Sequence, residues 1–321
     1  MMKNEKSPIS IIIDDSGVVN MFHFHHLCVE HSLLYPLEFT RRFAKVCGRY
    51  GIKGKFSFVP NPAGLGRLDG KKVSQVPSKL IKDHVKEVKK NIEPLFSITP
   101  EVLTHFMAYD LKRNAMTLTN EESYFSKLSK EEIRDYVGLA LEILCNLGLN
   151  PSGVTSPWSC GLDNEENYAK GIGMAFRKVM KKDSSFYFLH SGDHIQEPVI
   201  MCNSPETGKV VTIPANTPDP FWCANLPEKT LSARKKIKAN IDDLLSPDGK
   251  NGLIRELYEK KLPIILLTHA QCLFSDGRYI GLEGLEALAG RINKVFGSSV
   301  EWMTFEELAG KWKYKNENSF F

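Results

Sequence analysis

The chain has 321 residues, of which 42% are hydrophobic and 25% charged, a composition typical of a globular protein with one large α/β domain or two smaller domains. Its net charge of +4 comes from 42 basic and 38 acidic residues, a balance that argues against a nucleic-acid partner. No apolar run is long enough to cross a bilayer, so we expect no membrane span.

The amino-terminal segment is short and charged. The apolar stretch that follows it stops at Asp14 and Asp15, which is not the pattern of a signal peptide. Seven cysteines are scattered along the chain without CxxC spacing. We therefore expect reduced thiols in a cytoplasmic protein, rather than a disulfide framework or a zinc ribbon. No pattern indicates the oligomeric state.

Short, continuous apolar runs predict strands that are buried on both faces, as in parallel sheets. In chain order these runs cover residues 9–13, 55–59, 185–189, 263–268 and 300–303.

Helical patterns lie between these runs. Segments 36–46 and 79–88 are helix candidates, and Ser129 with Glu132 predicts a capping box for a helix that ends near Gly148. A second apolar face over 285–296 ends at Gly297, and Thr304 with Glu307 predicts another capping box. The alternation indicates one α/β domain over residues 1–321.

Two segments interrupt the alternation, and we interpret both as insertions at the rim of the domain. Residues 60–78 are rich in Gly, Pro and Lys and predict a long loop. Residues 198–214 predict a β-hairpin with strands 199–202 and 210–213.

Polar residues follow several of the predicted strands. Asp14 and Asp15 end the first run, His190 and His269 end two later runs, and a Pro157-Trp158 loop follows residues 153–156. In parallel β/α domains the carboxyl ends of the strands form the active-site mouth. We therefore expect these residues to share a pocket, although adjacent aspartates also occur in solvated turns or as helix caps.

The histidines leave alternatives open. His105, His25 and His26 suit a metal site or a substrate pocket, whereas His23 favours rim packing. His190 and His194 have HxxxH spacing, but on a loop this spacing does not place both rings on one face. Each of these histidines also fits a structural role with hydrogen bonds to the backbone.

Aromatic side chains are expected near the mouth, where they would stack on a sugar ring or pack at the rim. These are Trp158, Phe221 and Trp222. The residues expected to contact substrate are His25, His26, Pro157, Trp158, His190 and Trp222.

Taken together, these segments resemble the polysaccharide deacetylases with NodB homology. The resemblance rests on Ile-Ile-Ile-Asp14-Asp15, the run 55–60, the segment around His105, the loop 156–161, Leu-Leu-Thr-His269 and the closing segment 300–309. It runs in order through most of the chain. It implies a distorted (β/α) barrel with about seven parallel strands, and a divalent metal, zinc or a similar ion.

The resemblance also implies roles for individual residues. Asp14 would be the general base, Asp15 and His105 metal ligands, and His269 the general acid. The chain departs from the family where a second metal histidine is expected four residues after His105, because that position is Tyr109. Thr155 and Ser156 stand near the place of the arginine that the family has in the pocket wall; the candidates for a third metal ligand are His25, His26, Asp110 and His194.

Three functions remain open from the sequence. The first is a metal-dependent hydrolase that removes an acyl group from a sugar or a related amide. The second is a degenerate barrel that binds carbohydrate without deacetylating it. The third is a barrel glycoside hydrolase, for which Asp193 or Asp276 would have to join Asp14 or Asp15, because neighbouring residues of one strand point to opposite sides.

Overall fold

The first strand, β1 (Ser7–Asp14), has isoleucine at four of its eight positions, and β-branched side chains favour extended backbone. Each of these isoleucines is at most 1% exposed. The strand has parallel partners on both sides, which explains why its apolar run is continuous rather than alternating. The computed structural model describes residues 6–25, 31–192, 194–226 and 229–315.

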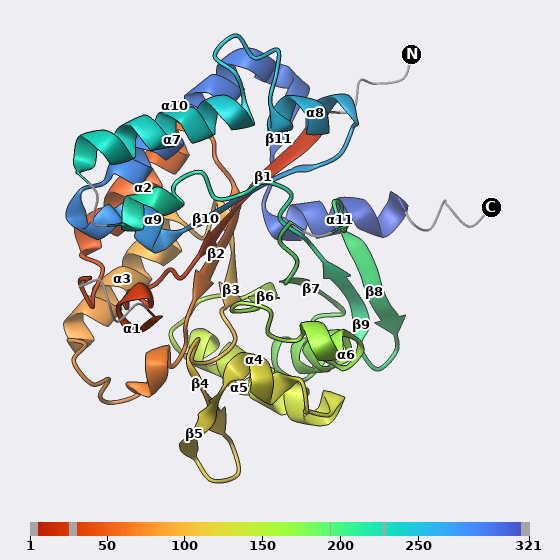
Figure 1. The fold of residues 1–321 in the computed structure, drawn as a ribbon. Coiled ribbons are helices and arrows are strands. Elements are labelled where there is room, and N and C mark those ends of the chain that lie inside the picture. Colours follow the sequence, from red (N-terminus) through yellow and green to blue (C-terminus); the bar gives the residue numbers. More distant parts are fainter. Residues whose placement is uncertain (1–5, 26–30, 193, 227–228, 316–321) are drawn as a thin grey trace.

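The other elements follow in chain order (Figure 1). The remaining strands are β2 (Gly54–Phe58), β3 (Phe96–Pro100), β4 (Met107–Asp110), β5 (Ala115–Asn120), β6 (Gly153–Thr155), β7 (Ser184–Phe188), β8 (Val199–Ser204), β9 (Gly208–Thr212), β10 (Ile264–His269) and β11 (Val300–Trp302). The α-helices are α1 (Phe22–His25), α2 (Leu37–Tyr50), α3 (Ser78–Asn91), α4 (Glu121–Phe125), α5 (Lys130–Asn146), α6 (Glu165–Ala175), α7 (Thr230–Leu244), α8 (Leu253–Glu259), α9 (Ala270–Phe274), α10 (Ile280–Phe296) and α11 (Phe305–Lys315).

Two mainly parallel sheets meet between β3 and β6. In the first sheet the order is β10-β1-β2-β3, and β11 also pairs with β1. The second has the order β6-β7-β9-β8. Two isolated parallel bridges, Ile98 with Pro151 and Glu101 with Thr155, connect β3 to the β6 segment. The carboxyl ends of β1, β3, β6 and β10 therefore lie on the same side of the molecule.

The parallel α/β architecture expected from the sequence is confirmed. Among the described residues, no strand ladder joins β9 to β10; the segment after β9 bonds there, with the backbone N–H of Asn216 donating to the carbonyl of Ile265 (3.2 Å). The closure of the barrel and its expected count of about seven parallel strands are therefore not confirmed by these ladders.

The two segments interpreted as rim insertions have defined positions. The hairpin at 198–214 consists of β8 and β9, as expected, and β9 also pairs in parallel with β7, so the hairpin extends the second sheet. In the 60–78 segment, the backbone N–H groups of Asn61 and Ala63 donate to the carbonyls of Leu103 and Thr104. This loop therefore braces the segment that carries His105.

The expected helices are present. Ser129 and Glu132 form a reciprocal capping box at α5, and the backbone N–H groups of Thr304 and Glu307 bond the other residue's side chain at α11. The helix α10 ends before Gly297, whose φ of +52° suits glycine. The predicted helix 36–46 corresponds to α2, which begins one residue later with Pro36 as its N-cap, and 79–88 lies within α3; both helices extend further toward the carboxyl terminus.

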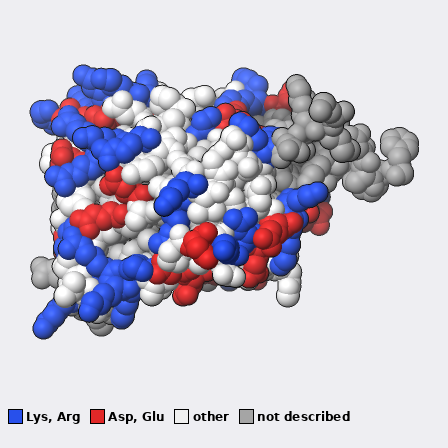
Figure 2. Space-filling model, turned by 90° about the horizontal axis from the view of Figure 1, so that it is seen from above, with Lys and Arg blue, Asp and Glu red and all other residues white. Residues whose placement is uncertain are grey.

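Helices cover the outside of the strands (Figure 1). The helices α2, α3, α7 and α10 pack with one another beside β1 and β2, while α5 packs against α6 near the second sheet. On the face shown in Figure 2, basic and acidic side chains are interspersed around a largely uncharged area. Within the described part of the chain, no helix is long and apolar enough to cross a membrane.

Candidate active site

Four acidic or basic side chains meet at the carboxyl ends of β10, β1 and β3, three strands of the first sheet. Asp14 ends β1 and is the register partner of His269, which ends β10. Asp15 follows β1 directly, and Glu101 follows β3. Because parallel strands present their carboxyl ends on one side, this register brings Asp14 and His269 together at one mouth, with Asp15 next to Asp14 in the chain.

Asp14 forms a buried ion pair with Lys55 of β2. The Lys55 side chain is fully buried, and its ammonium donates to Asp14 Oδ1 and, at 2.6 Å, to the hydroxyl of Thr155. Thr99 lies 2.8 Å from the same hydroxyl. The cation that balances Asp14 is thus supplied by β2, whereas Thr155, near the expected arginine position, contributes a hydroxyl to it.

Asp15 has other partners than Asp14 and belongs to a second group of side chains. His105 Nδ1 lies 2.7 Å from Asp15 Oδ1 and 3.4 Å from Glu101 Oε1. The other oxygens are also held: Gln271 donates to Asp15 Oδ2 at 2.5 Å, and Ser57 donates to Glu101 Oε2 at 2.6 Å. Asp15, Glu101 and His105 are all buried, and one donor atom from each lies within 4.8 Å of the others.

Glu101 is the functional residue that sequence reasoning missed. A partner for His105 was sought four residues later, at Tyr109, but the partner is four residues earlier. Tyr109 instead donates its hydroxyl to Asn114 at 2.6 Å in the β4–β5 hairpin. Residues 96–100 form a buried strand that the sequence pattern did not indicate. Glu101 directly follows this strand, and its polar side chain at a strand end was the signal that could have identified it.

Electrostatics couple the three side chains. Burial, followed by the negative charge of Asp15, raises the pKa of Glu101 to about 7. Burial alone would lower the pKa of His105, but the carboxylates of Asp15 and Glu101 raise it to about 9. Burial would likewise raise the pKa of Asp15, yet His105 holds it well below its usual range. The carboxylates of Asp15 and Glu101 lie within 4.8 Å of each other, so a positive charge between them is needed to offset their repulsion.

The donor set fits a divalent cation. Asp15 Oδ1 and His105 Nδ1 are buried, and neither has a hydrogen-bond partner of acceptable geometry among the described residues, despite their short separation. Both atoms therefore remain available to a ligand that would bind between the side chains of the triad. Two carboxylates and one imidazole are three protein ligands, the number typical of a catalytic zinc site.

A buried carboxylate, Glu121, holds the segment that carries His105. Glu121 accepts the backbone N–H groups of Leu103, Thr104 and His105 at 2.8–3.2 Å, and the hydroxyl of Tyr136 at 2.7 Å. His105 has a φ of +50°, a conformation that costs free energy for a residue with a side chain. Four hydrogen bonds to one carboxylate offset that cost and set the direction of the imidazole.

His269 is paired with Asp219, which lies in the loop before α7. The distance from His269 Nδ1 to Asp219 Oδ2 is 2.9 Å. Burial would lower the pKa of His269, but the hydrogen bond and charge of Asp219 raise it to about 9, with Asp15 and Asp14 adding to the effect. His269 is therefore an imidazolium at neutral pH, as a proton donor must be.

Aromatic side chains flank the two histidines. Trp158 is 44% exposed and its ring lies 4.7 Å from His105 and 5.0 Å from His25. Trp222 is 41% exposed and lies 5.1 Å from His269. Phe221 was also expected near the mouth, but it is buried in the core at 1% exposure, so Trp222 is the exposed member of this pair.

The remaining predicted site residues have varied environments. His25 donates its Nε2 proton to the carbonyl of His105 at 2.8 Å, so it supports this segment from α1. Pro157, which precedes Trp158 in the chain, is buried, and His190 bonds Glu165 at 2.8 Å beside β7. His194 is exposed.

Asp110, another candidate for a third metal ligand, does not belong to the group. Asp110 accepts backbone N–H groups of its own hairpin turn, so it is a turn residue rather than a ligand. His26 and Asp193 fall outside the described residues. Asp276, proposed as a partner in a glycoside hydrolase pair, accepts two hydrogen bonds from Ser32.

Comparison with known proteins was made by sequence and by structure. No protein-family description matches the chain, and no curated protein matches its sequence. Solved structures do match. A probable polysaccharide deacetylase from Pseudomonas aeruginosa PAO1 has a TM-score of 0.53 at 12% identity, covering 99% of this chain and 94% of the other.

Two further structures give the same result. The Puue allantoinase has a TM-score of 0.54 at 12% identity, covering 97% of this chain and 92% of that one. A glycoside hydrolase/deacetylase from Parabacteroides distasonis, whose assignment is provisional, has a TM-score of 0.51 at 13% identity, covering 95% of this chain and 70% of the other. The chain therefore has the NodB-like deacetylase fold, which confirms the resemblance noted in the sequence.

The buried ion pair generates a stability prediction. Lys55→Met should destabilise the fold by about 3–5 kcal/mol, because it leaves Asp14 buried without a cation. Adding Asp14→Asn should recover most of this loss, since the double variant buries no charge there. Urea denaturation of the single and double variants measures both effects.

Lys53→Met is the matched control. Lys53 is 31% exposed and pairs with Glu307 at the surface, so its loss should cost less than about 1 kcal/mol. Equal losses for Lys53→Met and Lys55→Met would contradict the importance assigned to the buried pair.

Proposed function

We propose that this protein is a deacetylase-like hydrolase that removes an acyl group from a sugar or a related amide, with a divalent cation held by Asp15, Glu101 and His105. One observation carries the proposal: this triad lies at the same strand ends as the Asp14–Lys55 pair and the Asp219–His269 pair. A cation site, an ionised carboxylate and a protonated histidine are the groups that hydrolysis of an acyl bond requires.

Each group has a distinct part in the proposed reaction. When bound, a cation of the zinc class would polarise the acyl carbonyl and lower the pKa of a water molecule. Asp14, which is ion-paired with Lys55, accepts the proton of the attacking water. His269, kept protonated by Asp219, delivers a proton to the leaving amine or hydroxyl. The acid and the base thus have separate charged partners.

A sugar is the proposed substrate because of the flanking aromatic groups. Trp158 lies beside His105 and Trp222 beside His269, so an apolar ring face would find a surface on either side of the reacting groups. One structural neighbour is named a polysaccharide deacetylase, while another is named an allantoinase. A cyclic amide is therefore the second substrate class to test.

Acetate release from N-acetylated sugars tests the proposed function. We expect wild-type protein to release acetate, and His269→Ala to lower kcat about 10²–10⁴-fold, the usual contribution of a general acid. His194→Ala is the matched control, since this histidine is exposed and should leave kcat unchanged. Ring opening of a cyclic amide without acetate release would overturn the sugar substrate, and sugar binding without turnover would indicate a degenerate, carbohydrate-binding barrel.

Metal content distinguishes the two possible partners of His105. Wild-type protein purified without chelators should hold one equivalent of divalent metal by elemental analysis. Glu101→Gln should bind it at least 10-fold more weakly, because one of three ligands loses its charge. Tyr109→Phe should bind it like wild type, since Tyr109 bonds Asn114 instead. Equal metal loss in both variants, or none in either, would count against the assigned ligand set.

The pH profile tests the role of the Asp219–His269 pair. Because Asp219 raises the pKa of His269 to about 9, kcat/KM should fall as pH rises through about 9. Asp219→Asn removes the charge that favours the imidazolium, so the alkaline fall should move to lower pH, toward the ordinary histidine value of about 6.5. Asp276→Asn, which changes a carboxylate bonded to Ser32, should leave the profile in place. An unmoved limb in Asp219→Asn would refute this role.

A further inference from the structure

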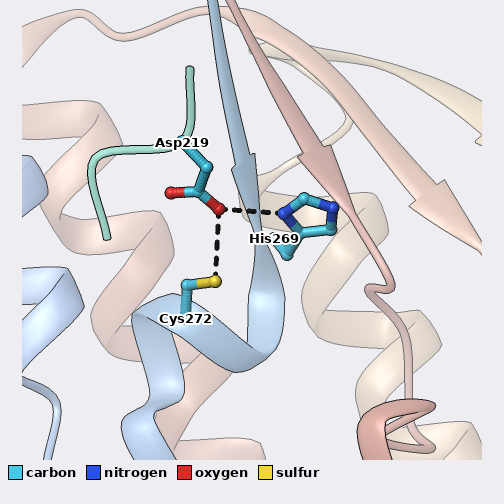
Figure 3. Close-up of side chains that lie close together, drawn as sticks. All are labelled: Asp219, His269 and Cys272. Carbon is cyan, nitrogen blue, oxygen red and sulfur yellow. Dashed lines mark hydrogen bonds and ion pairs between the residues drawn. The ribbon is translucent and has the colours of Figure 1, made fainter. Parts of the chain in front are cut away.

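A second group of metal-ligating side chains lies beside His269, apart from the triad of Asp15, Glu101 and His105. The Asp219 carboxylate lies between the ring of His269 and the sulfur of Cys272 (Figure 3). Asp219 Oδ2 is 2.9 Å from His269 Nδ1 and 3.2 Å from Cys272 Sγ. One donor atom from each of the three residues lies within 4.8 Å of the others.

Three different elements bring these residues together. His269 ends β10, Cys272 lies in the first turns of α9, and Asp219 comes from the loop before α7. Cys272 is fully buried and the Asp219 side chain is 6% exposed, whereas that of His269 is 21% exposed. An ion would therefore enter from the His269 side and meet a preformed, buried pair of donors.

The sulfur is provided with a hydrogen-bond donor of its own. Asn225 donates its side-chain N–H to Cys272 Sγ at 3.1 Å, while Asn225 Oδ1 is buried without a hydrogen-bond partner among the described residues. Burial and the charge of Asp219 raise the pKa of the Cys272 thiol, while the Asn225 donor lowers it, so the thiolate that binds metal forms when an ion displaces the thiol proton. The site thus gives the Cys272 sulfur a polar contact that an apolar core would not provide.

We propose that Asp219, His269 and Cys272 form a second cation site, which takes a borderline-soft divalent ion of the zinc class. Carboxylate, imidazole and thiolate are together a ligand set for zinc, and the thiolate selects against Mg²⁺ and Ca²⁺. The triad at Asp15 contains no sulfur, so the two sites differ in chemistry as well as in place.

The charge balance of binding is favourable for a buried site. Without the ion, the Asp219 carboxylate is neutralised by the His269 imidazolium, and Cys272 is a neutral thiol. Binding of one divalent ion releases one proton from the imidazolium and one from the thiol. The ion is then balanced by one carboxylate and one thiolate, so the net charge of the cluster is zero before and after binding.

Occupancy of this site would switch off the proposed reaction. A His269 ring that binds an ion through Nδ1 has lost its Nδ1 proton and is no longer an imidazolium, so it cannot act as the general acid. This consequence rests on the proposed function, but the binding itself does not. Excess zinc would thus inhibit at the second site, although a cation of the same class supports activity at the first.

Cadmium titration tests the site independently of any activity. Cd²⁺ bound to thiolate gives an ultraviolet charge-transfer band, whereas the sulfur-free triad at Asp15 gives none. We expect wild-type protein to develop this band with one equivalent of Cd²⁺ and Cys272→Ser to show none. Asp219→Asn should keep the band but need at least 10-fold more cadmium, in line with the loss of a supporting charged group.

Cys145→Ser is the matched control. Cys145 is half-buried, bonds Met180 and belongs to neither cluster, so its replacement should leave the band unchanged. A band that persists in Cys272→Ser, or no band in wild type, would overturn the proposal. Should Cys272→Ser fail to fold by circular dichroism, the Asp219→Asn shift decides, and an unshifted titration there would also overturn it.

Zinc inhibition supplies the functional arm. With acetate release as the readout, wild-type activity should fall at zinc concentrations that saturate the band-forming site. Cys272→Ser, normalised to its own rate without added zinc, should resist inhibition at least 10-fold more. Failure of the proposed hydrolase activity would leave the cadmium result standing, so the two proposals fail separately.

Discussion

Three carboxylates packed at the ends of β1 and β3 set the terms for the rest of this structure. Asp14, Asp15 and Glu101 are at most 5% exposed, so water cannot screen their mutual repulsion. Each must have a positive or hydrogen-bonding partner for the fold to persist. Much of the local architecture can be understood as the supply of those partners from neighbouring elements.

The partners divide the carboxylates into two groups. Lys55 projects from β2 to Asp14, while His105 reaches Asp15 and Glu101. Asp14 is the last residue of β1, whereas Asp15 leaves the strand with a φ of +53°, so the two aspartates enter different environments although they are neighbours in sequence. In the proposed reaction, this separation would allow one to serve as a base and the other as a ligand.

The group around His105 needs more support than the Asp14–Lys55 pair, because His105 lies in an irregular segment whereas Lys55 lies in the strand β2. Glu121 holds the backbone of that segment through three N–H groups, and His25 bonds the carbonyl of His105. The loop that follows β2 bonds the same segment from another direction. A site that depends on backbone at positive φ is held in place by several elements at once, which is how strained conformations persist in folded proteins.

The sequence by itself determined the local elements and the strand ends. Continuous apolar runs and capping boxes are short-range signals, so β1, β10, α5 and α10 were predictable, as was the shared location of Asp14, Asp15 and His269. Only the tertiary structure decided the partners of these residues. Lys55 neutralises Asp14 across a strand pair, and Asp219 reaches His269 from 50 residues away in the chain. Glu101 became a ligand candidate because β3 lies beside β2, and register between parallel strands is set by the packing of whole sheets rather than by any local pattern.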